Sequence, residues 1–454
     1  MAIFSRRILQ QMIDSNTRML TEDQVKKHVD ALNRANEQSL DFEWEVAIIY
    51  GLSKLGNIRH EPDFGIPGKQ RRLDIIFDSN RPVEVAFAGD VMTVSDRGLH
   101  KENPQNFFTA ELTRRIQKSG LPTQFFSYRI NGNYDGSYGD RKVRLLVPAK
   151  NKLREFFGKR FQDFLSEVAR FPEREHSFDE KTEQVDVQIR YIPGQQFFSG
   201  SYLSYTNVTS LTRNSLSNAL KKKVQKFKES SYHGYKIVFV CDGGSNSLQM
   251  VVSQDYGRQG AMSVIDKFFR DHSSINLVVI MGIDRQDESP FLRGMGRPIL
   301  RLRSFENPHH KRPETQVINE LLYQLTDLIP PPDNDVVNTI HHLQSKEKRV
   351  GISSKGGWKM TSKEVKFSSR AIQELLAGRL TQEEFFKLHG MIDLQGARAI
   401  GNPFEKALAE GRLIESTAVE KNSDKDDDWL VFRFGEPDPA IFRFRAPRKS
   451  EDHR

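Results

Sequence analysis

The chain has 454 residues, a length that favours two or three domains over one. Hydrophobic residues make up 37% and charged residues 28% of the chain. The sequence contains no run of eighteen apolar residues, which a membrane-spanning helix would need. The net charge of +8 favours polyanionic partners, while the single cysteine, Cys241, excludes an internal disulfide and a cysteine-based zinc site. Cys241 lies in an apolar run and is expected to be a small buried thiol. The N-terminus lacks the apolar core of a signal peptide, so we expect a cytoplasmic protein.

The N-terminal third of the chain is predicted to lead from helices into a mixed α/β region. Residues 1–40 show apolar residues at helical spacing and form an N-terminal helical segment. Residues 41–148 then follow the order helix–strand–strand–strand–helix–strand. These elements are predicted at 41–55, 57–66, 72–77, 82–87, 104–118 and 124–130, with a further extended segment at 142–148. The short connections between the first three strands predict an antiparallel meander.

The remainder is predicted to form two further parts. Residues 149–329 read as an α/β region with alternating helices and apolar strands, including a basic helix. Its elements are helices at 150–170, 214–229 and 260–271 and strands at Tyr235–Cys241 and Ile275–Met281. Three consecutive prolines, Pro330–Pro332, predict a boundary. Residues 333–454 are expected to form a small C-terminal α+β domain whose role the pattern does not indicate.

Three acidic residues lie inside apolar runs between residues 44 and 87. Glu45 shares the apolar face of its predicted helix, where a carboxylate needs a partner such as a metal ion or an arginine. Asp74 lies within Leu-Asp-Ile-Ile-Phe and Glu84 within Val-Glu-Val-Ala-Phe, although strands disfavour these residues. On neighbouring strands, Asp74, Glu84 and the Val85 carbonyl would converge on one hard cation. Mg²⁺ (or Mn²⁺) suits such oxygen ligands.

These residues resemble the PD-(D/E)XK, or restriction-endonuclease-like, nuclease superfamily. Its pattern is a glutamate on a helix, an aspartate in one apolar strand and a glutamate–x–lysine motif in the next. Glu45, Asp74 and Glu84 match that order, and residues 41–148 match the order of elements. Pro62-Asp63 supplies a literal Pro-Asp pair, but its glycine-rich and proline-rich surroundings predict a loop.

The resemblance implies both a fold and an activity. The fold would be a restriction-endonuclease-like mixed sheet flanked by helices, followed by a second α/β layer and the C-terminal domain. The activity would be that of a Mg²⁺-dependent DNA phosphodiesterase, an endonuclease of restriction, repair or phage-defence type. Asp74, Glu84 and Val85 would hold the metal, and Glu45 would support the metal or its waters.

Ala86 stands where the family has its catalytic lysine, two residues after Glu84. That lysine orients the attacking water and stabilises charge on the phosphate, which alanine cannot do. Three interpretations remain open: a deliberate replacement of lysine by alanine, a natural loss of catalysis, or a lysine that has moved to Lys101 or Lys118. The intact residues around Ala86 favour the first. We therefore predict a nuclease that is inactive because it has alanine at position 86. The alternative is a catalytically silent nucleic-acid-binding or assembly protein.

Two groups of basic residues are candidates for binding nucleic acid. One group directly precedes Asp74 and consists of Lys69, Arg71 and Arg72. The other lies on the predicted helix at 214–229, where five lysines would neutralise several phosphates or simply form a solvated face. These lysines are Lys221, Lys222, Lys223, Lys226 and Lys228. DNA is the expected partner; a membrane is not, and a homo-oligomer or a protein partner fits the large flanking regions.

Other polar features favour simpler explanations. Asp242 and Asp284 follow apolar strands, where ligands often bind, but no phosphate-binding glycine motif accompanies them. They are expected to be strand-ending turns, so a nucleotide-binding regulatory domain at 210–285 ranks third. Adjacent histidines point in different directions on regular structure, and His309-His310 and His341-His342 are therefore expected to be exposed.

Overall fold

A computed structural model describes most of the chain in two compact units. One unit comprises Met1–Arg18, Val25–Ser39 and Pro330–Arg454, and the other comprises Met19–Gln24 and Leu40–Ile329. The described residues are 3–34, 39–64, 72–79, 84–96, 104–137, 140–204, 208–248, 259–286, 296–337, 339, 358–361, 363–391, 401–423, 425–442 and 444. Several candidates lie outside them, namely Lys69, Arg71, Lys101, His341 and His342.

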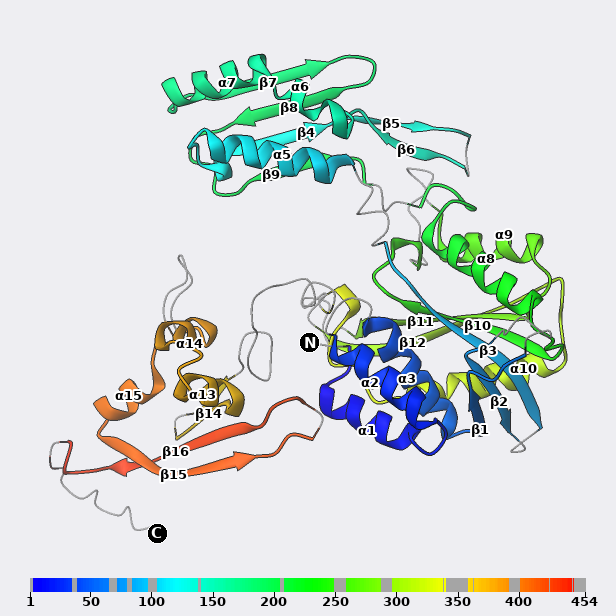
Figure 1. The fold of residues 1–454 in the computed structure, drawn as a ribbon. Coiled ribbons are helices and arrows are strands. Elements are labelled where there is room, and N and C mark those ends of the chain that lie inside the picture. Colours follow the sequence, from blue (N-terminus) through cyan, green and yellow to red (C-terminus); the bar gives the residue numbers. More distant parts are fainter. Residues whose placement is uncertain are drawn as a thin grey trace, which may run out of the picture. The chain divides into compact units, whose positions relative to one another are not determined.

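The larger unit is built on a six-stranded mixed sheet in the order β1-β2-β3-β10-β11-β12 (Figure 1). Its strands are β1 (Asn57–His60), β2 (Ile75–Ser79), β3 (Val85–Val94), β10 (Tyr235–Asp242), β11 (Leu277–Gln286) and β12 (Arg297–Glu306). The first three form the predicted antiparallel meander, β3, β10 and β11 run parallel, and β12 is antiparallel to β11. The middle of β10 is buried on both faces, which explains its continuous apolar sequence.

Helices cover both faces of this sheet (Figure 1). They are α3 (Ser39–Ser53), α8 (Ser215–Lys228), α9 (Ala261–Asp271), α10 (Glu314–Tyr323) and α11 (Leu325–Leu328). Helices α8 and α9 share one buried core with Ile76 and Ala88 of the sheet. Trp44 of α3 donates from Nε1 to the carbonyl oxygen of Asp242, at 2.9 Å. Gly51 lets α3 pack closely, because a Cβ there would lie 2.8 Å from Ile329.

The segment between β3 and α8 forms a sheet of its own, in the order β7-β8-β4-β9, together with the hairpin β5-β6. Its elements are α5 (Pro104–Lys118), β4 (Phe126–Ile130), β5 (Gly132–Asp135), β6 (Lys142–Leu145), α6 (Leu153–Phe156), α7 (Lys159–Arg170), β7 (His176–Lys181), β8 (Asp186–Tyr191) and β9 (Ser199–Tyr202). Aromatic residues such as Phe108, Phe126 and Phe161 fill its core. The helix predicted at 150–170 is interrupted at Gly158.

This insertion corrects the expected extent of the first domain. Residues 41–148 were predicted to form one nuclease-like core, but β4 belongs to the sheet β7-β8-β4-β9, and α5 packs in the core of that sheet. The helix and strand that follow the meander in the first sheet are instead α8 and β10, more than a hundred residues further along the chain. Local patterns predicted the elements, but they could not show which sheet each element joins.

The smaller unit contains the predicted C-terminal α+β domain. Its sheet has the order β13-β14-β16-β15. The elements of this unit are α1 (Arg6–Asn16), most of α2 (Glu22–Asn33), β13 (Trp358–Met360), β14 (Glu364–Ser368), α13 (Ser369–Leu376), α14 (Gln382–Leu388), α15 (Pro403–Ala409), β15 (Arg412–Glu420) and β16 (Trp429–Pro437). Val365, Phe367 and Phe385 lie in its core. None of the described helices of either unit is long and apolar enough to cross a membrane.

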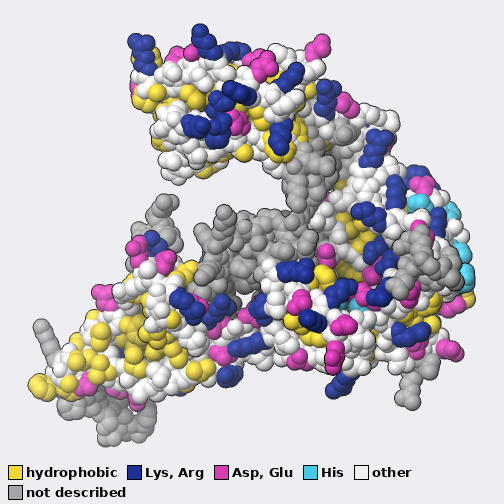
Figure 2. Space-filling view, in the orientation of Figure 1, with side chains coloured by type: hydrophobic (Ala, Val, Ile, Leu, Met, Phe, Trp, Pro, Cys, Tyr) yellow, Lys and Arg dark blue, Asp and Glu magenta, His cyan; other side chains and the backbone are white. Residues whose placement is uncertain are grey.

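Hydrophobic side chains are exposed on the C-terminal domain, where Figure 2 shows them gathered in yellow. They include Leu376, Leu408, Leu413, Ile414 and Val419, the last three on the edge strand β15. Exposed apolar patches mark interaction surfaces more often than chance. They fit the expected homo-oligomer or protein partner, which stays a prediction.

Within the smaller unit, one ion pair joins the two ends of the chain and gives a testable contribution to stability. Arg7 Nη1 lies 2.8 Å from Asp428 Oδ1, which also accepts a hydrogen bond from the backbone of Asn422. These contacts lower the pKa of Asp428 to about 2. The Arg7 side chain is 40% exposed, so solvent screens the pair and we expect Asp428→Asn to cost only about 1 kcal/mol at pH 7.

The loss in the free energy of unfolding that Asp428→Asn causes should become smaller as the pH falls. A pKa lowered on folding stabilises the protein above the unfolded value of 3.8, and this contribution is lost as pH falls toward about 2. Urea denaturation at pH 7 and at pH 3 should therefore show a smaller difference between wild type and Asp428→Asn at pH 3. Glu383→Gln, on an exposed helix pair, is the control. A deficit that is equal at both pH values would contradict this account.

Candidate functional site

Two aspartates face each other across the β2–β3 ladder. In that ladder Ile75 pairs with Gly89, so continuing the antiparallel register by one residue sets Asp74 opposite Asp90. Asp74 Oδ2 accepts a hydrogen bond from the backbone N–H of Val91, at 2.8 Å. The Asp90 side chain is fully buried and the Asp74 side chain is 20% exposed. Two carboxylates this close require a shared proton or a cation.

Helix α8 supplies two lysines to this pair of aspartates. Leu220, Val224 and Phe227 anchor the helix in the core, and Lys223 and Lys226 lie beside this apolar face, about one turn apart. Each lysine ammonium contacts both aspartates. Lys226 Nζ lies 2.7 Å from Asp74 Oδ1 and 2.5 Å from Asp90 Oδ2.

Lys223 has an additional backbone partner. Its Nζ forms an ion pair with Asp90 Oδ1, lies 3.5 Å from Asp74 Oδ2 and donates to the carbonyl oxygen of Val91, at 2.8 Å. We name Asp74, Asp90, Lys223 and Lys226 the aspartate–lysine cluster. The cluster contains two negative and two positive groups when all four are ionised.

The two aspartates have opposite pKa shifts. Burial raises the pKa of Asp90 well above its ordinary value, and the charge of Asp74 raises it further. Burial acts on Asp74 in the same direction, but Lys223, a hydrogen bond from Asp90 and Lys226 outweigh it, so the pKa of Asp74 lies well below its usual range. The same carboxylates outweigh burial at Lys223 and raise its pKa. Perturbed carboxyl pairs of this kind are typical of functional sites.

Of the predicted metal ligands, the structure does not bring Glu84 and Val85 to Asp74. Glu84 is exposed and directly precedes β3, six residues from Asp90 and about 20 Å from it along the strand. Val85 pairs with Ser79 and Ala86 with Asp78, at the far end of the ladder. Ala86 is exposed, so a lysine at this position would not reach the aspartate–lysine cluster.

Glu45 has a histidine as a partner. Its Oε1 lies 2.8 Å from Nε2 of His60, whose side chain is fully buried. His60 pairs with Ile75 in the β1–β2 ladder, and successive strand residues point to opposite faces. Glu45 therefore contacts the sheet on the face opposite to the one that Asp74 shares with α8.

The basic candidates have different environments. Lys223 and Lys226 form ion pairs with carboxylates instead of pointing to solvent. Lys221, Lys222 and Lys228 are exposed on the other faces of α8, and Lys221 also donates to the Thr212 carbonyl. Arg72 is exposed and lies 4.0 Å from Glu61. Lys118 ends α5, a helix of the inserted segment that packs in the core of the sheet β7-β8-β4-β9.

The sequence interpretation missed Asp90, although a signal for it exists. Asp90 interrupts the apolar strand Val85–Val94 just as Asp74 interrupts its own run. The spacing of the family motif instead predicted Glu84 as the second carboxylate, because Glu84 lies ten residues after Asp74. The register of the ladder, which the sequence does not state, makes Asp90 the residue opposite Asp74.

The rival positions have structural roles. Burial raises the pKa of Asp242, and its Oδ1 accepts from the Gly244 N–H at 2.7 Å, as in a strand-ending turn. The expectation of a turn is wrong for Asp284, which lies within β11; its Oδ2 is 3.2 Å from Nε of Arg301 on the adjacent strand. Cys241 is fully buried, as expected, and burial raises the pKa of its thiol.

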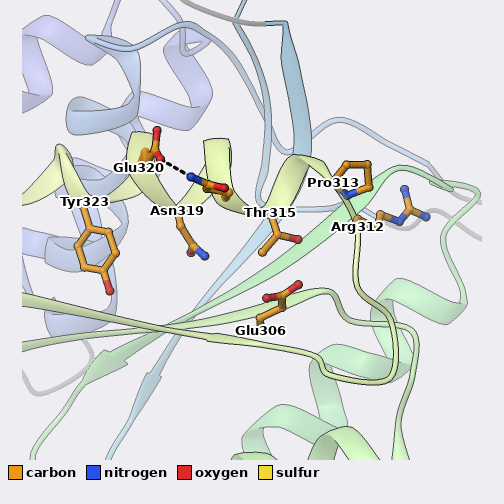
Figure 3. A pocket seen from close by; sticks show the side chains of 8 residues that line it. Glu306, Arg312, Pro313, Thr315, Asn319, Glu320 and Tyr323 are labelled. Atoms are coloured by element: carbon orange, nitrogen blue, oxygen red, sulfur yellow. Dashed lines mark hydrogen bonds between the residues drawn. The ribbon is translucent and has the colours of Figure 1, made fainter.

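A pocket of about 420 Å³ lies elsewhere, between β12 and α10 (Figure 3). Glu306, Arg312, Asn319 and Tyr323 are among the residues that line it. Figure 3 shows Glu320 hydrogen-bonded within α10. None of the residues predicted from the sequence to form a site lies in this pocket, and its mixed charges indicate no particular ligand.

No protein-family model, curated protein or solved structure matches the chain.

Proposed function

We propose that the protein is a Mg²⁺- or Mn²⁺-dependent phosphodiesterase that cleaves DNA, with Asp74 and Asp90 as metal ligands. The observation that carries the proposal is the facing pair of carboxylates, Asp74 directly before β2 and Asp90 on β3, contacted by two lysines of one helix. Their oxygens are the hard donors that these cations prefer. The bound metal would polarise the phosphate and lower the pKa of a water.

The order of elements supports this proposal. Helix α3, the meander β1-β2-β3, helix α8 and strand β10 repeat the helix–strand–strand–strand–helix–strand order of the PD-(D/E)XK nucleases, with the second sheet inserted before α8. Asp90-Val91-Met92 would then occupy the place of the acid–x–lysine motif. Met92 cannot provide a positive charge, but Lys223 and Lys226 can.

The lysines would act on the substrate and not on the metal. A lysine ammonium beside the carboxylates can bind a phosphate oxygen, orient the phosphodiester and stabilise the charge that develops on it. Lys223 is the stronger candidate for this role, because its contact with the Val91 carbonyl fixes its position. This proposal keeps the interpretation that the lysine has moved, but assigns it to α8 rather than to Lys101 or Lys118. With the lysine supplied by α8, the protein would be an active enzyme although it has alanine at position 86.

A cleavage assay tests the proposal. The full chain is incubated with Mg²⁺ or Mn²⁺ and labelled single-stranded DNA, double-stranded DNA or RNA, and EDTA serves as the control. We expect DNA cleavage that requires the metal. If none of these substrates is cut with either metal, the protein is not a nuclease of this kind.

One observation favours a second candidate function, a catalytically silent protein that binds nucleic acid or assembles a complex. Two carboxylates and two ammoniums compensate one another, so the aspartate–lysine cluster can also serve as a buried structural ion-pair network. Calorimetric titration with Mn²⁺ separates the two functions. The silent protein would show no binding that depends on Asp90.

The exposed lysines of α8 give a prediction about nucleic-acid binding. Replacing Lys222 and Lys228 with glutamate should weaken binding to DNA and reduce the salt dependence of the affinity, because fewer phosphates are neutralised. Fluorescence anisotropy at several salt concentrations measures both quantities. The control is Lys363→Glu with Lys387→Glu, which changes the net charge equally in the C-terminal domain. Equal losses in both double variants would show that α8 has no specific role.

A further inference from the structure

We infer that Lys226 occupies the position of the metal cation in the resting site, so that metal binding and nucleic-acid binding are coupled. This inference rests on the proposed function and describes how the same site is regulated. Lys226 Nζ lies 2.7 Å from Asp74 Oδ1 and 2.5 Å from Asp90 Oδ2. A cation bridging the two carboxylates would use these same oxygens, so the ammonium and the metal compete for them.

The two lysines are not equivalent in this competition. Lys223 donates to the Val91 carbonyl as well as contacting both carboxylates, so it keeps a partner when a metal arrives. The contacts of Lys226 within the described residues are with the two aspartates. Its side chain is 26% exposed on a flexible stem, and it can move toward solvent. Lys226 is therefore the group that a metal displaces.

A displaced ammonium near the surface becomes available to a phosphate. Without nucleic acid, a metal must displace Lys226 and leave it without a carboxylate partner. With nucleic acid, a backbone phosphate receives the ammonium and offsets that loss. Thermodynamic linkage then requires nucleic acid to raise the affinity for metal and metal to raise the affinity for nucleic acid by the same factor. The site would thus assemble fully only when the substrate is present.

The test measures the affinity of the full chain for Mn²⁺ by the electron paramagnetic resonance signal of the free ion. Lys226→Met removes the ammonium but keeps the apolar stem, and it should bind Mn²⁺ about tenfold more tightly than wild type. Lys159→Met removes the same charge from an exposed position on α7, which belongs to no proposed site, and should match wild type. An oligonucleotide with non-hydrolysable linkages should raise the Mn²⁺ affinity of wild type about tenfold, after the ions bound by the oligonucleotide alone are subtracted. This increase should be absent in Lys226→Met.

The outcomes separate the inference from the proposed function. If wild type and Lys226→Met bind Mn²⁺ with equal affinity, and Asp90→Asn does not bind it, the inference is overturned. The proposal of a metal site at Asp74 and Asp90 is then still supported. Mn²⁺ binding that is the same in wild type and Asp90→Asn would overturn the proposed function itself. If Lys226→Met fails to fold, the oligonucleotide dependence of wild type decides alone. No change in Mn²⁺ affinity on adding the oligonucleotide would then overturn the inference.

Discussion

Replacing Asp90 with asparagine should reduce metal-dependent DNA cleavage by a factor of about 10² to 10³ or more. Asp90 is fully buried opposite Asp74, and an amide in its place removes one of the two negative charges that would hold the cation. Losing a single preorganised group at a reacting phosphate typically costs this much in rate. Asp74→Asn should have an effect of the same size. Initial rates on labelled DNA at saturating Mn²⁺ measure both.

Glu84 and Ala86 provide the controls, because the spacing of the family motif places them in the catalytic site and the structure places them away from Asp74 and Asp90. Both are exposed at the far end of the β2–β3 ladder. Glu84→Gln should leave the rate within a factor of about two, and Ala86→Lys should not increase it, since neither position affects the preorganised groups at the site. If Ala86→Lys creates cleavage in a protein that otherwise lacks it, the site is centred on Glu84 and the aspartate–lysine cluster is structural.

Removing both lysines of the cluster should destabilise the protein strongly. In Lys223→Met with Lys226→Met, the apolar stems remain, but the fully buried carboxylate of Asp90 and the largely buried carboxylate of Asp74 lose their positive partners. Breaking a buried ion pair in this way costs about 3–5 kcal/mol, because it leaves an uncompensated charge. Urea denaturation at pH 7 measures the free energy of unfolding.

A rescue variant identifies the cause of that loss. Adding Asp74→Asn and Asp90→Asn to the double lysine variant removes the uncompensated charges and should recover much of the stability. Lys221→Met with Lys222→Met, which changes two exposed lysines of the same helix, should have little effect. A loss below about 1 kcal/mol in the double variant of Lys223 and Lys226 would contradict the arrangement of the cluster.

The sequence predicted the elements of the fold whose hydrophobic periodicity is strong. The meander, the basic helix at 214–229 and the parallel strands β10 and β11 all bury apolar faces, and their residues repeat at the spacing of helices or strands. Strand β15 was not predicted, because most of its side chains are exposed and it lacks the alternation that burial imposes.

The candidate site was predicted only in part, and the reason is geometric. Asp74 is recognisable as an acid within an apolar strand, but its partner depends on the register of the ladder, which no local pattern states. The lysines of α8 are separated from Asp74 by about 150 residues that include a whole inserted sheet. Their inward direction follows from the buried face of α8, namely Leu220, Val224 and Phe227. The sequence showed that face, but it did not show what the face packs against.

A crystal structure of the protein with Mn²⁺ tests the proposed metal site directly, because anomalous scattering locates the ion. We expect one anomalous peak between Asp74 and Asp90, within coordinating distance of both carboxylates, with Lys226 displaced from their oxygens. Mn²⁺ bound beside Glu84, or at Glu45 and His60, with both lysines still paired to Asp74 and Asp90, would contradict it.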